Sequence, residues 1–255
     1  MKKVIAITNQ KGGVGKTTTA LSLLGALREK SKKYRVLGID LDPQGSLAYS
    51  AGVDDLEHRS TFYDVLRGDV SMEEAIVETE MGDILPANID LSMIEREFNE
   101  TGRECLLRDK LRAVADDYDY IIIDTPPALN TLTLNAYVAA QGLIIPMVPE
   151  ILSILGIAQI RDTIREVRER HNPDLEILGI LLNRCNMRLL LNREVAEMSQ
   201  DIARSLGTRV FKTQIHTSVS VAESPAHGES VITHAPSSKP ARDFKALLNE
   251  LMRLE

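Results

Sequence analysis

The chain has 255 residues and a formal net charge of −7, with 44% apolar and 26% charged residues. This is the composition of a soluble globular protein that is long enough for one sizeable core. It excludes a bilayer-spanning protein, because no run of about 20 apolar residues is present, and it argues against a protein whose whole surface binds polyanions. We expect one domain over residues 1–255, with no N-terminal helix-turn-helix extension.

The charge is unevenly distributed along the chain. Residues 1–53 carry nine basic and three acidic groups, whereas residues 54–120 carry seven basic and nineteen acidic groups. Residues 184–212 are again basic, with six basic and three acidic groups. A local basic face is therefore compatible with the acidic total.

Apolar runs and amphipathic stretches alternate along the chain, which predicts parallel strands joined by helices. The segment from residue 50 to residue 100 is harder to interpret and is expected to hold short helices, for example residues 61–67, and one strand. The expected strands are residues 4–8, 35–42, 83–86, 120–127, 142–148 and 175–183, and the expected helices are residues 17–29, 61–67, 152–170, 192–206 and 241–254. We therefore predict an α/β fold with a mostly parallel, twisted sheet flanked by helices.

The segment NQKGGVGKTT, residues 9–18, lies between the first strand and the first helix. Its end matches the phosphate-loop pattern G-x-x-x-x-G-K-[ST] at Gly15, Lys16 and Thr17, but Gln10 stands where the pattern has its first glycine. The glycines let backbone N–H groups converge on one anion at the positive end of the helix. We predict that Lys16 meets nucleotide phosphates and that the Thr17 hydroxyl ligates Mg²⁺. The alternative is a glycine-rich turn with incidental lysines.

Three acidic residues follow two of the expected strands. Asp40 and Asp42 lie at the end of the second strand and Asp124 at the end of the strand near residue 120. Because open parallel sheets bind ligands at the carboxyl ends of their strands, we expect these acids beside the loop. Asp124 would hold the metal through water, and Asp40 would orient the attacking water. Alternatively, each acid is a helix cap or a turn former.

Two cysteines, Cys105 and Cys185, form no CxxC pair, and we interpret them as reduced thiols. None of the five histidines has a zinc-like spacing with a cysteine. The spacing therefore predicts no metal site among these residues.

The loop and four further segments resemble the ParA/Soj family of partition ATPases. The segments are IDLDPQGS (39–46), YIIIDTPP (120–127), TLNAYVAAQGLIIPMVPE (133–150) and AESPAHGESVI (222–232). This family belongs to the deviant Walker A group of P-loop NTPases, together with MinD and the nitrogenase iron protein. The resemblance implies that fold and a Mg²⁺-dependent ATP hydrolase with weak basal activity that a partner stimulates.

The resemblance also implies roles for individual residues. ATP and Mg²⁺ would be enclosed between two subunits, and Lys11 would reach the partner's phosphates, where a cation offsets the repulsion of two facing triphosphates. Lys11, Lys16 and Asp40 would form the catalytic group, Asn183 would hydrogen-bond adenine, and the backbone near Pro225 would flank the base. The expected nucleotide-binding residues are Lys11, Gly12, Gly13, Val14, Gly15, Lys16, Thr17, Thr18, Asn183 and Pro225.

By the same resemblance, the partners are a second copy upon ATP binding, non-specific DNA and a ParB-type centromere-binding protein, with no membrane. The protein would be cytoplasmic and associated with the nucleoid. Many family members have an arginine where this chain has Ser220, so one expected DNA contact is absent. The remaining candidates for DNA binding are Arg184, Arg188, Arg209, Lys212, Lys239 and Arg242.

Three other functions stay open at this stage. A MinD-like membrane-cycling ATPase would need a basic amphipathic C-terminal tail, whereas this tail ends ALLNELMRLE. An electron-transfer ATPase like the nitrogenase iron protein would need paired cysteines for an iron–sulfur cluster, and no cysteine directly follows the Asp124 segment. A metabolic kinase would need a substrate pocket.

Overall fold

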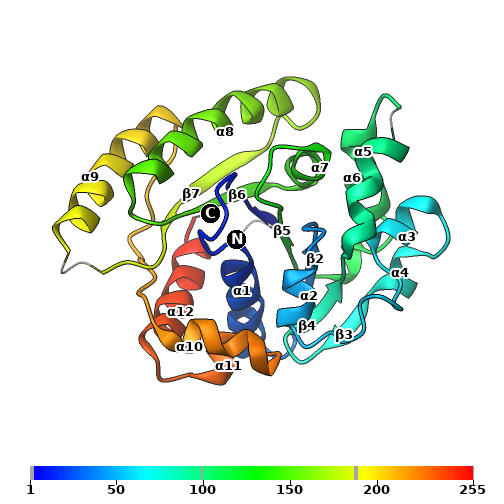
Figure 1. Cartoon of the computed structure of the whole chain (residues 1–255), viewed down its shortest axis with the longest axis horizontal. Coiled ribbons are helices and arrows are strands. Elements are labelled where there is room, and N and C mark those ends of the chain that lie inside the picture. Colours follow the sequence, from blue (N-terminus) through cyan, green and yellow to red (C-terminus); the bar gives the residue numbers. More distant parts are fainter. Residues whose placement is uncertain (1–2, 99, 187–188, 255) are drawn as a thin grey trace.

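The molecule is an open, mostly parallel sheet with helices on both faces (Figure 1). It is a computed structural model that describes residues 3–98, 100–186 and 189–254. The strands are β1 (Val4–Ile7), β2 (Val36–Asp40), β3 (Val77–Thr79), β4 (Gly82–Leu85), β5 (Tyr120–Asp124), β6 (Gly142–Met147) and β7 (Glu176–Leu182).

The helices follow the strands in alternation along most of the chain. They are α1 (Lys16–Lys30), α2 (Ser46–Ser50), α3 (Phe62–Arg67), α4 (Met72–Ala75), α5 (Ile94–Glu97), α6 (Leu106–Leu111), α7 (Thr131–Ala139), α8 (Ile151–Arg170), α9 (Leu190–Ser205), α10 (Val219–Glu223), α11 (Val231–His234) and α12 (Lys239–Leu251). Short 3-10 helices are η1 (Ile89–Met93), η2 (Arg103–Cys105), η3 (Ala115–Asp117) and η4 (Ser224–His227).

The order of the strands explains where a ligand crevice forms. Within the described residues, the sheet has seven strands in the order β3-β4-β2-β5-β1-β6-β7. The pairs are parallel except the edge pair β3–β4. From β1 the chain first goes to β2 on one side, and later to β6 on the other, so the order reverses beside β1. Open α/β sheets bind ligands at the carboxyl ends of strands next to such a reversal.

The strands are apolar at nearly every position because both faces of the sheet are covered. Ile121 and Ile123 of β5 enter one buried cluster, and Ile122 between them enters the other. The first cluster is covered by α3 to α9, and the second by α1, α2, α11 and α12 (Figure 1). Successive side chains of a strand point to opposite faces, so a strand buried on both sides cannot alternate with polar residues.

Local sequence signals explain where several helices begin. The Asn130 side chain accepts a hydrogen bond from the Thr133 N–H at the start of α7, and Ser238 accepts one from the Ala241 N–H at the start of α12. Thr61 and Asp64 form a capping box at α3. These side chains satisfy N–H groups that have no partner within the helix.

The edge of the sheet at β7 is covered by an irregular segment, residues 209–217. The Ile180 N–H donates to the Arg209 carbonyl over 2.8 Å, and the Ile215 N–H donates to the Leu182 carbonyl over 2.9 Å. This segment protects the edge strand and leads into α10 beside the loop.

The predicted fold class is confirmed. Every expected strand and helix is present, although several strands are one to three residues shorter than expected. The sequence did not predict β3, which is three residues long and antiparallel to β4, or helices such as α2 and α7. No helix among the described residues is both long and apolar enough to cross a membrane.

Candidate functional site

The loop between β1 and α1 lies beside two of the acids that follow strands. Asp40 and Asp124 are direct neighbours in the register of β2 and β5, and Asp124 is paired with Ile7, the last residue of β1. Three strand ends therefore bring two carboxylates next to the glycine-rich loop, as the rule for parallel sheets predicts.

The glycines of the loop are required by its backbone path. Gly13 and Gly15 have φ angles of 74° and 90°, a region that residues with a side chain rarely adopt. A Cβ atom on Gly15 would also lie 2.5 Å from the Asn183 Nδ2 atom. The Thr19 N–H donates to the Gly15 carbonyl over 3.0 Å, so α1 starts directly from the loop. The loop and the positive end of α1 thus meet at one point.

Lys16 is a largely buried cation in this loop. Its side chain is at the start of α1, and its Nζ atom donates to the Lys11 carbonyl over 3.4 Å. Burial lowers the pKa of Lys16, while the charges of Asp124 and Asp42 act in the opposite direction. A lysine that is held in a partly desolvated anion-binding loop is suited to meeting phosphate.

Asp124 is the least satisfied group of the site. It is fully buried, and neither carboxylate oxygen accepts a hydrogen bond of acceptable geometry from the described residues. Burial raises the pKa of Asp124 to about 7, although the Thr17 hydroxyl and the charge of Lys16 lower it. Buried carboxylates are normally paired or coordinated, so these free oxygens beside a hydroxyl fit a hydrated Mg²⁺ ion.

Both carboxylate oxygens of Asp40, by contrast, accept hydrogen bonds from backbone N–H groups. One of its oxygens accepts from the Asp42 N–H over 3.0 Å, and the other accepts from the N–H groups of Leu47 and Ala48 over 2.9 and 3.1 Å. Burial raises the pKa of Asp40 well above its ordinary value, and the nearby Asp124 adds to this effect. The side chain thereby fixes the turn that starts α2.

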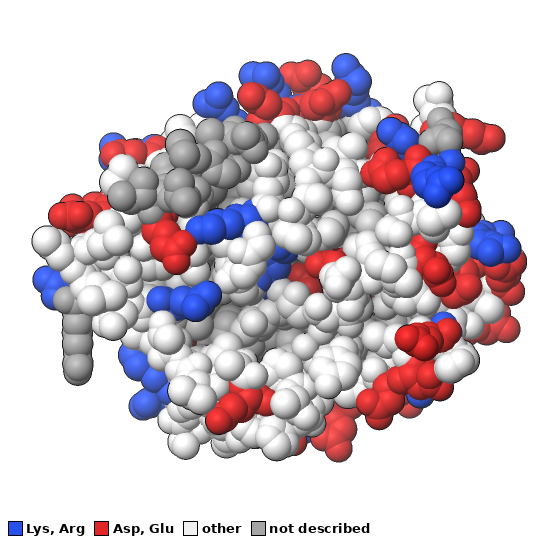
Figure 2. Space-filling view, in the orientation of Figure 1, with Lys and Arg blue, Asp and Glu red and all other residues white. Residues whose placement is uncertain are grey.

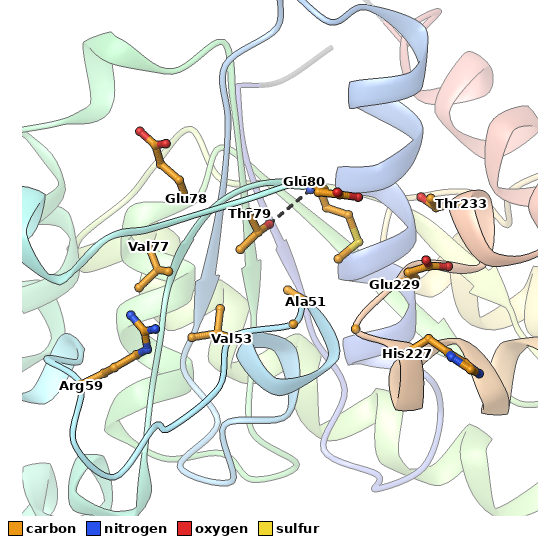
Figure 3. A pocket seen from close by; sticks show the side chains of 13 residues that line it. Ala51, Val53, Arg59, Val77, Glu78, Thr79, Glu80, His227, Glu229 and Thr233 are labelled. Atoms are coloured by element: carbon orange, nitrogen blue, oxygen red, sulfur yellow. Dashed lines mark hydrogen bonds between the residues drawn. The ribbon is translucent and has the colours of Figure 1, made fainter.

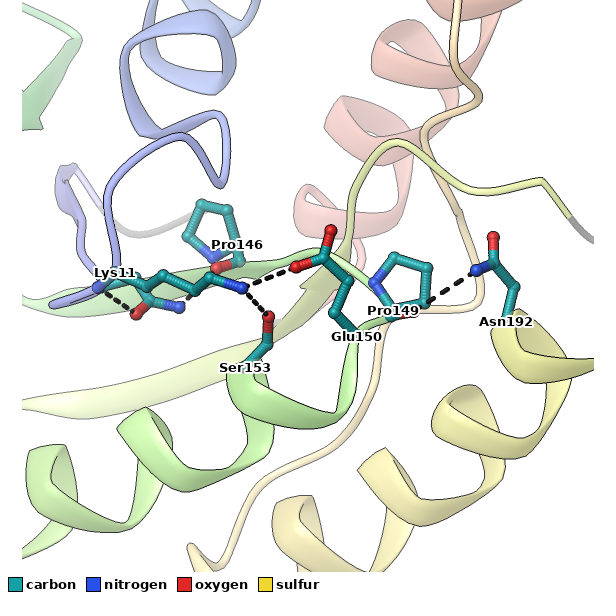
Figure 4. A network of polar contacts seen from close by, with 7 residues as sticks. Lys11, Pro146, Pro149, Glu150, Ser153 and Asn192 are labelled. Atoms are coloured by element: carbon teal, nitrogen blue, oxygen red, sulfur yellow. Dashed lines mark hydrogen bonds and ion pairs between the residues drawn. The ribbon is translucent and has the colours of Figure 1, made fainter.

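Lys11 points away from the interior of its own loop (Figure 4). Its Nζ atom donates to Glu150 Oε2 over 2.7 Å and to Ser153 Oγ over 3.1 Å, at the start of α8. The Lys11 N–H donates to the Asn9 side chain, whose Nδ2 group donates to the Pro146 carbonyl. The hydrogen bond from Lys11 lowers the pKa of Glu150. Residue types alone gave no reason to single out Glu150, but its place after β6 follows the rule that located Asp124.

Asn183 faces the loop from the end of β7. Its Nδ2 group lies 3.1 Å from the Val14 carbonyl and 3.3 Å from Thr19 Oγ1. The residue also lines a cavity of about 390 Å³ that adjoins Gly13, Gly15 and Thr18. Segment 215–222, which the sequence analysis did not predict to lie here, forms another wall of this cavity. Pro225 lies in η4 and is not among the described residues that line it.

The described candidates for DNA binding come from three parts of the chain. Arg184, with φ 55°, lines the same cavity, whereas Arg209 and Lys212 are exposed on the segment along β7. Lys239 and Arg242 lie at the start of α12, where Lys239 is 3.8 Å from Asp243, and Arg188 is outside the described residues. Figure 2 shows acidic side chains predominating on the side where Figure 1 places α3 to α6.

A larger cavity of about 700 Å³ lies away from the loop (Figure 3). It is lined by the β3–β4 turn, the residues after α2 and the end of η4, including Arg59, Glu78, Glu80, His227 and Glu229. The β3–β4 turn precedes the amino end of β4, which is parallel to β2, so this part of the cavity lies at the amino ends of the strands. The glycine-rich loop follows the carboxyl end of β1.

Comparisons with known proteins agree with this geometry. A family model described as an AAA domain matches residues 2–177. The chain is 39% identical over 258 residues to the chromosome partitioning protein ParA of Caulobacter vibrioides, covering 99% of this chain and 95% of that protein. It is 39% identical over 254 residues to the sporulation initiation inhibitor protein Soj of Bacillus subtilis, covering 98% of each.

A solved structure of similar sequence shares the whole fold. Cobyrinic acid a,c-diamide synthase from Mycobacterium smegmatis, with a bound ATP analogue and magnesium, is 37% identical to this chain with a TM-score of 0.86, over 99% of this chain and 95% of that one. The similarity thus spans the loop, the acids and both faces of the sheet. The predicted family is confirmed: the chain belongs to the ParA/Soj family of partitioning ATPases.

Proposed function

We propose that the chain binds ATP and Mg²⁺ at the loop after β1, hydrolyses ATP, and thereby controls a homodimer that binds DNA and a ParB-type partner. The observation that carries this proposal is the buried carboxylate of Asp124 beside Lys16 and Thr17, whose two oxygens accept no hydrogen bond of acceptable geometry. A nucleotide site needs a cation for phosphate and oxygen ligands for Mg²⁺ at this point, and the chain supplies both.

Different residues at this site would bind the phosphates, the Mg²⁺ ion and the adenine. The N–H groups of the glycine-rich loop and the Lys16 ammonium would hold the phosphates. Thr17 would ligate Mg²⁺ directly and Asp124 would hold it through water, and the bound ion would neutralise phosphate charge. Asn183 and segment 215–222 line the adjoining cavity, which supports placing the adenine there.

We assign two roles to Asp40. Its position next to Asp124 in the sheet supports its proposed role in orienting the attacking water. Its three backbone contacts also hold the turn before α2, so its removal would loosen that turn as well.

Lys11 is proposed to contact the nucleotide phosphates of the second subunit. In the free protomer the Lys11 ammonium forms an ion pair with Glu150 and does not point into the phosphate-binding loop of its own subunit. Reaching a partner's phosphates would require Lys11 to leave Glu150, so the nucleotide of one subunit would compete with a carboxylate of the other. This competition makes dimerisation depend on the γ-phosphate, and hydrolysis would then separate the pair.

The decisive experiment compares dimerisation with turnover. Lys11→Ala should abolish ATP-dependent dimerisation on a sizing column, while nucleotide binding survives in part. Lys245→Ala, which removes a surface cation paired with Glu29, is the matched control and should dimerise normally. A Lys11→Ala protein that still dimerises with ATP would refute the proposed sandwich.

Turnover is measured with and without DNA and the ParB-type partner. Asp40→Ala should retain the ATP-bound dimer but lose hydrolysis, and normal turnover in this variant would remove Asp40 from the mechanism. Stimulation by DNA and partner supports partitioning, whereas ATP-dependent flotation with liposomes would support the MinD-like alternative instead.

A further inference from the structure

We propose that Glu104, Cys105 and His171 form a binding site for a divalent transition-metal ion such as Zn²⁺. One potential ligand atom from each of these residues lies within 4.8 Å of the others. The Cys105 Sγ atom is 3.9 Å from His171 Nδ1, and His171 Nε2 is 3.4 Å from a Glu104 carboxylate oxygen. Thiolate, imidazole and carboxylate are the three side-chain ligands that zinc takes in proteins.

The spacing is close to what coordination requires. Zinc–sulfur and zinc–nitrogen bonds of about 2.3 and 2.0 Å at a tetrahedral angle place the two ligand atoms about 3.5 Å apart. The Cys105 Sγ and His171 Nδ1 atoms therefore need to approach by only a few tenths of an ångström. A single ion binds only one ring nitrogen, so the Glu104 carboxylate, which lies beside Nε2, has to turn toward the Nδ1 side as the ion binds. As the sulfur–metal bond forms, the thiol proton is released to solvent, so no oxidant or reductant is needed.

Both turns that carry the ligands are anchored to α7, which keeps them in place without a metal. The Asn135 side chain accepts from the Leu107 N–H over 2.9 Å and donates to the Arg103 carbonyl over 2.8 Å, which fixes η2. Asn172, next to His171, donates to the carbonyls of Tyr137 and Ala140 over 2.9 and 2.7 Å. Preorganised ligands lose little conformational freedom on binding a metal.

The cluster is also accessible. The side chains of Glu104 and His171 are 23% and 26% exposed, so an ion can enter and a water molecule can fill a fourth position. Three protein ligands and one water complete a tetrahedral site.

This site is remote from the glycine-rich loop and independent of the proposed ATPase cycle. His171 directly follows α8, whose other end begins beside Lys11 and Glu150. A helix of 20 residues is about 30 Å long. The metal would clamp the end of α8 to η2, in the connection between β4 and β5, and so stabilise the native chain.

The test uses the untagged full-length chain without nucleotide. Co²⁺ is titrated in, and the near-ultraviolet charge-transfer band of a cobalt–thiolate bond is recorded, followed by displacement with Zn²⁺. We expect one equivalent to produce the band. Cys105→Ser should abolish the band, and His171→Gln should weaken Zn²⁺ binding roughly tenfold or more. Glu104→Gln should retain the band with weaker binding.

Cys185→Ser is the matched control, because Cys185 is a buried thiol outside the cluster and its removal should leave the band intact. Thermal unfolding gives a second readout: Zn²⁺ should raise the midpoint of the wild-type chain and of Cys185→Ser, but not that of His171→Gln. A wild-type chain without the band, or a Cys105→Ser chain that keeps it, would overturn the proposal and leave the cluster as an ion pair beside a thiol. If Cys105→Ser does not fold, the comparison of His171→Gln with Glu104→Gln decides.

Discussion

Single residues of the nucleotide site differ mainly in whether their charges already have partners. Lys11 is paired with Glu150 and Asp40 with three backbone N–H groups, whereas the Asp124 carboxylate has no hydrogen-bond partner among the described residues. A buried carboxylate without well-formed hydrogen bonds destabilises the native chain, and a bound divalent cation would offset this cost. Asp124 is therefore the residue of this site whose environment most favours binding of a metal ion.

Asp124→Asn should stabilise the metal-free protein at alkaline pH. Because burial raises the pKa of Asp124 from 3.8 to about 7, the native chain binds more protons than the unfolded chain between these pH values. The contribution of Asp124 therefore makes the free energy of unfolding fall as the pH rises through this range, and the loss is complete above pH 7. At pH 8 the variant should gain up to about 4 kcal/mol over the wild type, and near pH 4 the gain should vanish.

Urea unfolding without Mg²⁺ or nucleotide measures this difference. Asp174→Asn is the control, because Asp174 is an exposed aspartate in the turn before β7 and should leave the stability unchanged. Equal stability of wild type and Asp124→Asn at pH 8 would contradict the raised pKa of the buried Asp124 carboxyl.

Among the elements, α8 connects the two sites described above. Its first turn holds Lys11 through Glu150 and Ser153, and its last residue precedes His171. The Lys11–Glu150 pair is largely solvent-exposed on the Glu150 side, so it contributes little to stability. The ion pair should instead determine where the Lys11 side chain points.

Glu150→Gln should promote ATP-dependent dimerisation. Without the carboxylate, Lys11 no longer has to leave an ion pair to reach a second subunit, so the dimer should form at a several-fold lower protein concentration. Analytical ultracentrifugation with a non-hydrolysable ATP analogue measures this. Glu166→Gln on the same helix breaks the solvent-exposed pair with Arg170 and should leave dimerisation unchanged. An unchanged dimerisation constant in Glu150→Gln would show that the pair does not restrain Lys11.

Acidic and basic residues are unevenly distributed over the molecule. Segment 54–120, with nineteen acidic groups, includes α3 to α6, and Figure 2 shows acidic side chains predominating on that side. The described candidates for DNA contact lie instead just after β7, on the segment along β7 and at the start of α12. DNA should therefore approach the β7 side and be repelled from the opposite one.

Binding of the ATP-loaded protein to DNA should depend steeply on salt. Each phosphate contact contributes about −0.9 to the slope of log K against log salt, so removing one true contact should reduce that slope by about 1. Lys212→Ala tests a candidate, and Arg112→Ala on the acidic side is the control. Fluorescence anisotropy over a salt series gives both slopes. Affinity that does not change between low and physiological salt would argue against phosphate contacts.

The sequence by itself determined most of the strands and the longer helices, and it indicated a phosphate-binding role for the loop. Strands such as residues 120–124 are apolar because they are buried on both faces, and that pattern is local. Gly13 and Gly15 mark positive φ angles, and Lys16 and Thr17 follow them directly, so spacing alone indicated a phosphate site. The acids Asp40 and Asp124 could be placed because parallel strands end at a common edge.

Only the tertiary structure decided which distant side chains meet. Lys11 and Glu150 are 139 residues apart, and Cys105 and His171 are 66 residues apart, so no local spacing relates them. For this reason the sequence analysis predicted Mg²⁺ ligands in the loop and after β5 but no metal site among the cysteines and histidines. It also assigned Asn183 to adenine without its contact to the Val14 carbonyl. Such contacts follow from the strand order and from how α8 packs on the sheet, which depend on the burial of the whole core rather than on neighbours in the chain.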